Sequence, residues 1–292
     1  MFWSSTPPPP PPTLLESALA LDVKGLLEHE PLLHYYAGVC MILTGVCVIF
    51  VEVVLGMRAP YGKHADIKTA QYYGPKINAK VGWIFQECWS FLVPFALLVS
   101  GVGDAALRAS WPNQALLAMY MSHYLYRAFV FPLRMRQGAP MPIGVCLLAA
   151  MFCVYNGYLQ GRAWTALLLY PDPTASLLDT IIFVSGVALW AFGLYINLDA
   201  DNTLRNLRYP GSPRYTIPRG GAFEYVSGAN YFGEIVEWCG YALAAKGALP
   251  AVAFAFFTFA NTAPRAYHHH LWYKQKFAEY PKERRAVIPF VW

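Results

Sequence analysis

The sequence predicts an all-α, polytopic integral membrane protein with about seven transmembrane helices, its N-terminus outside and its C-terminus in the cytoplasm. Three observations predict this: an apolar composition, a series of apolar runs of suitable length, and an uneven distribution of basic residues. Apolar residues make up 57% of the 292 residues and charged residues only 13%. A soluble domain carries roughly 25% charged residues, so lipid must cover much of this surface. The net charge of +5 is spread over short hydrophilic gaps, which is typical of membrane-protein loops and not of a nucleic-acid-binding surface.

The first 31 residues are predicted to form an extramembrane tail, because they include the unbroken proline run Pro7–Pro12. Residues 32–292 then form a single transmembrane domain, whose apolar runs approach the roughly 20 residues that a membrane-spanning helix needs. The last two runs are short, so a re-entrant pair is an alternative for them, and Gly247 and Pro250 supply the tight turn between them. The predicted spans are Tyr35–Leu55, Val81–Val102, Ala115–Leu133, Ile143–Leu159, Thr180–Leu198, Tyr231–Ala245 and Ala248–Ala263.

With these spans, lysine and arginine fall mainly on one side of the membrane. The N-terminal tail and alternate loops hold only four of the 22 basic residues, and the other side holds the remaining 18. Positively charged residues are enriched in cytoplasmic loops, which places the N-terminus outside and the C-terminus inside. The four residues on the outer side are Lys24, Arg108, Arg162 and Lys246.

Two polar residues inside predicted spans are candidates for function. Glu87, in the run WIFQECWSF, lies about 9 Å along its helix from the cytoplasmic end, and an ionisable group at that depth is costly and usually functional. Tyr124, in SHYLYRAF together with Arg127, lies in the cytoplasmic half of the third span. The alternatives are a structural carboxyl that a neighbouring helix satisfies and an aromatic side chain that only packs.

A polar stripe follows the fifth span as it leaves the membrane. Asn197, Asp201, Arg205 and Arg208 recur at spacings of four, four and three residues, so they share one face of a helix. Arginine forks suit phosphates, and the carboxylate can accept hydrogen bonds from ribose or amide groups. The alternative is a solvated face with a surface pair between Asp201 and Arg205.

A second stripe, Asn230, Glu234, Glu237 and Tyr241, begins the sixth span. Its two carboxyls lie one turn apart at a membrane entrance and need partners, which the hydrogen-bonding part of a cofactor would supply. The run His268–His270 suggests a metal site. However, consecutive helical residues diverge by about 100° and cannot converge on one ion, so no metal is expected.

The run Gly101–Ala106 approximates the dinucleotide fingerprint GxGxxA. It follows a membrane helix instead of a strand and lies on the external side, so the context that gives the motif its meaning is missing. An apolar cavity with a few convergent polar groups, flanked by arginines, suits instead a lipophilic substrate and an anionic cofactor.

Several motifs occur in order over residues 61–292 and resemble those of the steroid 5α-reductase family. The first 60 residues lie outside this resemblance. The motifs are YGKH at Tyr61–His64, FQECWSF, HYLYRAFV, YNGYLQG, INLDADNTLRNLR, GGAFEYVSGANYFGEIVEWCGYALA and the terminal RAYHHHLWYKQKFAEYPKERRAVIPFVW.

The resemblance implies NADPH-dependent reduction of the Δ4 double bond of a 3-oxo-Δ4-steroid to the 5α-dihydro product. Hydride reaches C5, and negative charge develops on the C3 oxygen, which hydrogen-bond donors in a dry site stabilise. Glu87 and Tyr124 match the pair that binds the 3-keto group, with Gln86 and Trp83 beside them. Tyr124 donates through its phenol, and Glu87 donates when burial keeps it protonated.

The resemblance also implies a cofactor site that faces the cytoplasm, in a bacterial inner membrane or the endoplasmic reticulum. Glu234 matches a position near the nicotinamide. Arginines of the mammalian members are replaced at Thr216, Ala139 and Leu148, which favours a non-mammalian member and leaves other basic residues to neutralise the phosphates. The residues expected to bind NADPH are Asn197, Asp201, Arg205, Arg208, Tyr215, Asn230, Glu234, His269 and Tyr273, with Lys63, Arg136 or Arg214 near the phosphates.

Three other functions stay open. A related reductase could act on a polyprenol, an enoyl-CoA or another lipophilic enone, although the carbonyl-binding pair favours a ketone. An enzyme similar to the isoprenylcysteine methyltransferases shares the helical layout and a cytosolic cofactor pocket. A non-catalytic sterol-binding membrane protein would need no polar face at Asn197–Arg208. In each case a monomer in contact with membrane lipid is expected.

Overall fold

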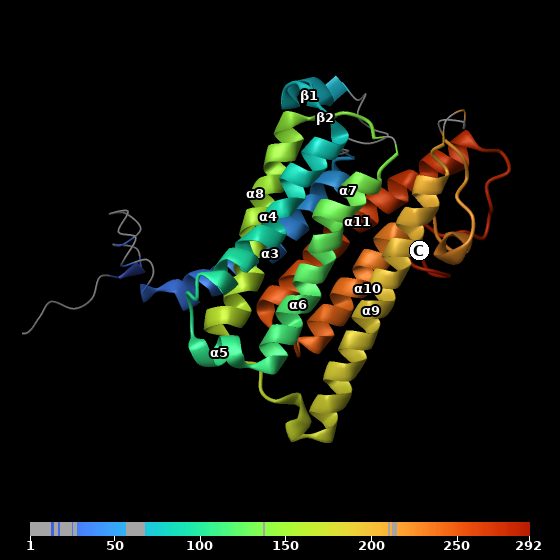
Figure 1. Ribbon diagram of the computed structural model, residues 1–292. Helices are drawn as coiled ribbons and strands as arrows, with labels where there is room; N and C mark the ends of the chain where they lie inside the picture. Colours follow the sequence, from blue (N-terminus) through green and yellow to red (C-terminus); the bar gives the residue numbers. More distant parts are fainter. Residues whose placement is uncertain are drawn as a thin grey trace, which may run out of the picture.

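The computed structural model is a bundle of long helices (Figure 1). It describes residues 13, 14, 17, 25, 28–56, 68–136, 138–209, 211 and 215–292. The proline run Pro7–Pro12, the YGKH motif with Lys63, and Arg214 lie outside the described residues. The long helices are α3 (Glu30–Ile49), α4 (Ala79–Val99), α6 (Trp111–Leu125), α8 (Ile143–Arg162), α9 (Leu177–Asn206), α10 (Ala229–Ala244) and α11 (Leu249–Lys276).

Shorter elements extend or connect these helices. Single π-helical turns continue α3, α6 and α8, and the turn after α6 leads directly into α7 (Phe131–Arg134). Strands β1 and β2 pair antiparallel over two residues each. The remaining bounds are Phe50–Val54, Tyr126–Val130 and Ala163–Leu167 for the π turns, Lys76–Ile77 for β1, Met141–Pro142 for β2, Ala105–Ala109 for α5, and Lys68–Tyr73, Pro173–Ala175 and Gly221–Glu224 for the 3-10 turns.

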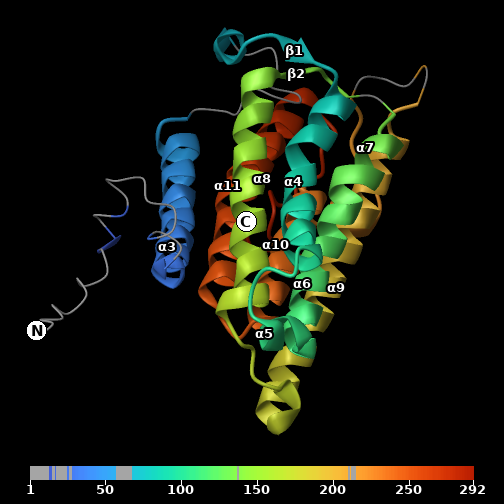
Figure 2. The same ribbon diagram turned by 60° about the vertical axis from the view of Figure 1, so that its left-hand side comes forward.

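The bundle has two distinct ends. In Figure 1 the β1–β2 pair lies at the top, and α5 and the connection between α8 and α9 lie at the bottom. We call these the ladder end and the α5 end. Because successive long helices alternate in direction, the C-terminal parts of α6, α9 and α11 and the N-terminal parts of α4 and α10 all lie towards the ladder end (Figures 1 and 2).

Local sequence explains where several of these helices begin. Asn78 caps α4, because its Oδ1 accepts hydrogen bonds from the backbone N–H groups of Lys80 and Val81 at 2.9 and 3.3 Å. Ser176 caps α9 in the same way through Asp179 N, at 3.0 Å. In the Gly101–Ala106 run, Asp104 caps α5, so this run connects the end of α4 to the start of α5.

Four glycines bring α9 and α10 unusually close together. Gly186 and Gly193 on α9 lie against the backbone of α10, and Gly233 and Gly240 on α10 lie against the backbone of α9. A Cβ atom at Gly193 would clash with the backbone N of Glu237. Small residues that allow such close contact are typical of helix interfaces in membranes. Here they pack the polar stripes of the two helices against each other.

Helix α3 packs along the edge of the bundle and is held at both ends by ion pairs. Its Gly38 lies against Leu249 of α11. At the α5 end, Arg162 donates two hydrogen bonds of 2.6 Å to the carboxylate of Glu30. At the other end, Arg265 lies 3.7 Å from Glu52.

The chain after α11 folds back onto the loop before α10. Ser227 N donates to Arg285 O at 2.8 Å, and Arg285 N donates to Tyr225 O at the same distance. The buried Arg284 donates to Pro218 O at 3.0 Å and lies over the ring of Tyr280. The C-terminus therefore covers the ladder end of α10 and α11.

An all-α membrane protein is confirmed. In the described part of the chain, four helices are long and apolar enough to cross a membrane, and side chains such as Leu43, Met151 and Val184 are more than half exposed on their outer faces. Helices also form at the other three predicted positions, but α10 has only 16 residues, and Arg127 and the polar second half of α11 make the other two less apolar. The four candidate spans are Glu30–Val54, Ala79–Val99, Ile143–Leu167 and Leu177–Asn206.

Candidate active site

Arg127 is the centre of a buried polar network at the ladder end. Its guanidinium donates to Asp201 Oδ2 on α9 at 2.9 Å and lies 3.3 Å from Glu234 Oε1 on α10. The three side chains are only 11%, 5% and 13% exposed. Trp83 and Phe131 lie on the guanidinium, with their ring centroids 5.0 and 4.5 Å from its carbon. One cation thus joins three helices and offsets the charge of two buried carboxylates.

Asn197 connects α9 to α10 beside this network. Its amide donates to the backbone oxygen of Asn230 at 3.0 Å and to Glu234 Oε1 at 3.3 Å. Asn197 is fully buried, and its Oδ1 has no hydrogen-bond partner within the described part of the chain. A buried acceptor without a partner is costly. It therefore marks a place where a ligand can donate a hydrogen bond.

Glu87 and Tyr124 lie deeper, on facing helices. Gln86 donates to Glu87 Oε1 at 3.4 Å, and the Cys153 thiol lies 3.9 Å from Glu87 Oε2. Glu87 lies deep among protein atoms, yet its side chain is only partly buried. This combination is expected of a carboxyl group that lines an internal space. The charges of Arg127 and Glu234 act on it, so this carboxyl adjoins the Arg127 network.

Tyr124 is 5% exposed and is held by aromatic neighbours. Its ring lies 4.9 Å from that of Tyr120 and stacks on Trp238 at 6.2 Å. The hydroxyls of Tyr120 and Tyr124 both approach Ser90 on α4, and Tyr124 lies within electrostatic range of Glu87. The two predicted carbonyl-binding residues therefore belong to one polar cluster in an otherwise apolar part of the bundle.

A buried His–Glu pair packs against the ring of Tyr124. His123 Nδ1 lies 2.8 Å from Glu237 Oε1, and both side chains are buried. The imidazole packs edge-on against Tyr124 at 5.1 Å and against Trp238 at 4.8 Å. This pair fixes the position of the aromatic side chains around the Tyr124 phenol.

The predicted cofactor residues on α11 lie where the chain folds back. Tyr273 stacks on Tyr280, with ring centroids 5.4 Å apart, and Tyr215 packs edge-on against Trp272 at 4.8 Å. Burial raises the pKa of Tyr273 to about 12, so its phenol remains a hydrogen-bond donor at neutral pH. The exposed Arg208 lies within electrostatic range of Tyr273, which brings the end of α9 next to α11.

The three consecutive histidines have separate surroundings, as the helical divergence predicts. His268 packs near Tyr267, at 6.2 Å between centroids, and His269 near Tyr231, at 5.6 Å. His270 Nδ1 lies 2.6 Å from the hydroxyl of Ser227. Among the described residues, no group of three histidine, cysteine or acidic side chains is arranged to hold a metal ion.

Three expectations from the sequence need correction or extension. The alternative of a surface pair between Asp201 and Arg205 is wrong, because Asp201 is buried against Arg127 and Arg205 bonds to Asn202. Trp83, which is expected to contact the substrate, also packs on the guanidinium of Arg127. Sequence reasoning gave no role to Arg127 or His123. The signal for both was present, since ionisable residues within a predicted span need buried partners.

Comparison with known proteins identifies the family. A sequence model of the 3-oxo-5-alpha-steroid 4-dehydrogenases matches residues 139–292. The chain is 47% identical to 3-oxo-5-alpha-steroid 4-dehydrogenase 1 of Bos taurus, over 84% of this chain and 91% of the relative. It is 46% identical to the same-named protein of Homo sapiens, over 79% and 85%. It is 41% identical to 3-oxo-5-alpha-steroid 4-dehydrogenase 2 of Rattus norvegicus, over 81% and 89%.

These matches confirm the resemblance expected from the motifs. The alignments extend over most of both partners, so the similarity is not limited to a shared helix or a short signature. The family is therefore one of reductases, and not one of methyltransferases or non-catalytic sterol-binding proteins. The chain belongs to the 3-oxo-5-alpha-steroid 4-dehydrogenases, the steroid 5α-reductase family, and is an oxidoreductase that acts on a CH–CH bond.

Proposed function

We propose that this protein reduces the Δ4 double bond of a 3-oxo-Δ4-steroid to the 5α-dihydrosteroid, with NADPH as the hydride source. The names of its relatives support the substrate class. The observation that supports the mechanism is the joint position of Glu87 and Tyr124 in one buried polar cluster, contributed by two different helices. An apolar bundle with so few polar groups at that depth suits a steroid with a single ketone at one end.

In this proposal Glu87 and Tyr124 hold the C3 oxygen. Reduction at C5 leaves negative charge on that oxygen, and donors that are already in position stabilise the enolate without reorganisation. The Tyr124 hydroxyl donates a hydrogen bond to the C3 oxygen and turns away from Ser90 to do so. Glu87 donates as the neutral carboxylic acid, which its apolar surroundings favour. Gln86 orients the carboxyl through its amide. The aromatic side chains around Tyr124 exclude water.

The proposed cofactor site adjoins this cluster at the ladder end. A bound NADPH would supply the hydride that C5 receives. The chain fits it through acceptors and donors that lack partners among the described residues, namely Asn197 Oδ1, Thr216 Oγ1 and Arg205 Nε. Asn197, Glu234 and Asn230 would hold the nicotinamide end. Asp201, Arg205, Arg208, Tyr215, His269 and Tyr273 would hold the rest, with Lys63 as a phosphate contact.

The proposal includes the membrane topology: the chain crosses the membrane seven times, with its N-terminus outside and its C-terminus in the cytoplasm. The 4-to-18 division of basic residues supports this orientation, because it puts the ladder end in the cytoplasm, where NADPH is available. Residues 32–292 then form one transmembrane domain that functions as a monomer in contact with lipid, after an extramembrane tail of 31 residues.

The test is steroid turnover and NADPH affinity, measured on the same purified samples of four variants. Glu87→Ala and Tyr124→Phe each remove a donor, and each is expected to lower turnover by about 10²–10³. Glu87→Gln keeps an amide donor, so its turnover should fall less than that of Glu87→Ala. NADPH affinity should stay close to that of the wild type, because the proposed cofactor residues lie on other helices.

Tyr120→Phe is the matched control. Tyr120 lies one turn before Tyr124 on α6, and its buried hydroxyl approaches Ser90 without making a hydrogen bond to a described residue. Its loss should change turnover by less than tenfold. The carbonyl assignment fails if Glu87→Ala turns over steroid at nearly the wild-type rate, or if Tyr120→Phe and Tyr124→Phe are equally impaired. Loss of NADPH affinity in Glu87→Ala would instead assign this residue to the cofactor or the fold.

A further inference from the structure

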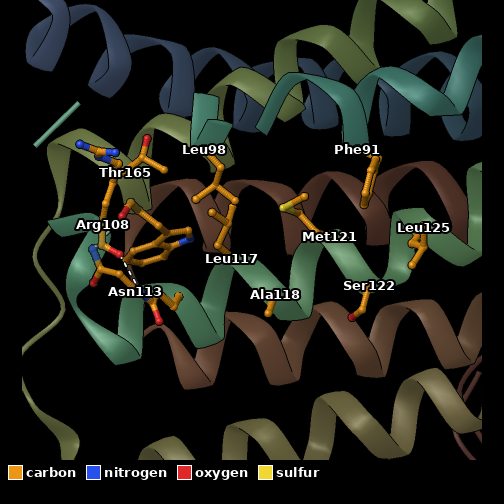
Figure 3. A pocket seen from close by; sticks show the side chains of 12 residues that line it. Phe91, Leu98, Arg108, Asn113, Leu117, Ala118, Met121, Ser122, Leu125 and Thr165 are labelled. Atoms are coloured by element: carbon orange, nitrogen blue, oxygen red, sulfur yellow. Dashed lines mark hydrogen bonds between the residues drawn. The ribbon is translucent and has the colours of Figure 1, made fainter. Parts of the chain in front are cut away.

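A cavity of about 340 Å³ opens between α4 and α6 towards the α5 end. None of the predicted site residues lines it. Figure 3 shows its lining side chains, most of which come from one face of α6. The walls are formed by Phe91, Leu98, Leu117, Ala118, Met121 and Leu125, and one end is polar. We call this cavity the α4–α6 groove.

The groove has the dimensions of one membrane leaflet. It follows α6 from Asn113 to Leu125, a length of about 18 Å at 1.5 Å per residue. Half of a bilayer's hydrocarbon core is about 15 Å thick. The groove is also open to the surroundings of the bundle, because Leu98 and Leu125 are 37% and 48% exposed. A hydrocarbon chain in the bilayer can therefore enter it from the side.

Most polar groups of the groove are already satisfied. The Asn113 amide makes three hydrogen bonds of 2.8–2.9 Å to backbone groups of residues 164–170. The hydroxyls of Ser122 and Thr165 each donate to a backbone oxygen of their own helix, at 3.0 and 2.8 Å. Gln114 donates to the backbone oxygen of Arg108 at 2.8 Å. None of these side chains needs a ligand.

Arg108 differs from them. Its Nε is buried without a hydrogen-bond partner, and the guanidinium makes no ion pair with any described residue. Asp104, one turn earlier, uses its Oδ1 to cap α5 through the N–H groups of Ala106 and Leu107, at 2.8 and 3.1 Å. In Figure 3 the guanidinium lies at the polar end of the groove, beside Thr165. A cation with unused donors therefore stands at the end of an apolar channel as long as one leaflet.

We propose that the α4–α6 groove binds a phospholipid, with the phosphate on Arg108 and one acyl chain between α4 and α6. An arginine fork matches phosphate oxygens, and a basic residue at the membrane surface attracts lipid headgroups. The apolar walls suit the chain, and the leaflet-long groove places headgroup and chain at their natural depths. The groove shares no lining residue with the proposed active site; its Arg108 end lies at the opposite end of the bundle, and its other end reaches the level of Tyr124 at Leu125.

The experiment is native mass spectrometry of the purified protein in detergent with three defined lipids. Phosphatidylglycerol and phosphatidylcholine carry the phosphate, and diacylglycerol carries the same chains without it. The wild type should retain one phospholipid and release diacylglycerol. Arg108→Gln should bind phospholipid about tenfold or more weakly, and Arg108→Lys should keep most of the affinity. Ala118→Trp should exclude the chain by filling the groove.

Two matched controls separate this site from unspecific lipid. Lys246→Gln removes a positive charge at the same end of the bundle, where Lys246 pairs with Asp179. Val184→Trp adds the same ring on the exposed face of α9. Both should retain the phospholipid. Equal retention by wild type and Arg108→Gln, or equal binding of diacylglycerol, overturns the assignment to a phosphate. Stoichiometric displacement of the lipid by a 3-oxo-Δ4-steroid overturns it too and makes the groove part of the substrate route.

Discussion

Replacing Arg127 by glutamine should destabilise the protein more than the loss of any surface ion pair. The substitution keeps much of the side-chain length but removes the charge between Asp201 and Glu234, which lie 2.9 and 3.3 Å from it. Both carboxylates are at least 87% buried, since their exposed fractions are 5% and 13%. Removing one partner of a buried ion pair costs about 3–5 kcal/mol, because the remaining charge is left uncompensated. Trp83 and Phe131 also lose their contact with the cation.

Thermal unfolding in a single detergent measures the effect. One kcal/mol shifts the midpoint by about 2–4 °C in proteins of 150–250 residues, so the midpoint should fall by on the order of 10 °C. Arg219→Gln is the control, because Arg219 and Glu224 are 3.5 Å apart but 57% and 43% exposed. An exposed pair contributes about 0–1 kcal/mol. Arg219→Gln should therefore unfold within a few degrees of the wild type.

A compensated variant tests the stated cause. In Arg127→Gln with Asp201→Asn and Glu234→Gln, no buried charge is left without a partner, so much of the lost stability should return. The reasoning is refuted if Arg127→Gln and Arg219→Gln unfold at the same temperature. It is also refuted if the triple variant is no more stable than Arg127→Gln alone, since the loss would then come from packing and not from stranded carboxylates.

Three further predictions concern the helix interface, the C-terminal fold and the cofactor. Gly193→Ala should destabilise the fold by at least 1–3 kcal/mol, because the added methyl meets the backbone of α10; an unchanged unfolding midpoint would contradict this. Burial and the nearby Lys274, Arg284 and Arg285 lower the pKa of His270, so stability should be lost as the pH falls through about 6.5, where the unfolded state takes up the proton first. His270→Asn should show a shallower decline, and identical pH profiles would exclude His270 as the cause. Arg208→Ala should weaken NADPH binding more than NADH binding; equal losses would assign Arg208 to the pyrophosphate or the fold.

The helices could be predicted from the sequence because the membrane sets their length and composition. Every predicted span overlaps a helix, from Tyr35–Leu55 over α3 and its π turn to Ala248–Ala263 over α11. The ends were less predictable. Helices α9 and α11 continue well beyond their apolar runs, to Asn206 and Lys276, because backbone hydrogen bonds hold a helix together whether its side chains are apolar or polar. Hydropathy therefore marks the lipid boundary and not the end of the helix.

The partners within the site could not be predicted, because they depend on which helix faces which. Arg127 and Asp201 are separated by 74 residues, and His123 and Glu237 by 114. Spacing along one helix showed that Asn197 and Asp201 share a face, but it gave no information on the side chain opposite. The same spacing suggested a pair between Asp201 and Arg205. The bundle instead offers Asp201 a buried cation on the π turn after α6, which a carboxylate in a low-dielectric environment prefers to a less buried neighbour.

The glycine contacts between α9 and α10 link the fold to the proposed chemistry. Asn197 bridges to Asn230 and Glu234 only because Gly193 and Gly233 let the two backbones touch. Residues with a Cβ at these positions would push the helices apart, and a separation of even 1 Å would lengthen hydrogen bonds that are now 3.0 and 3.3 Å. Arg127 would then have to span a wider gap to reach both carboxylates. The glycines thus position a polar network to which they contribute no side chain. Their substitution should impair cofactor binding together with stability.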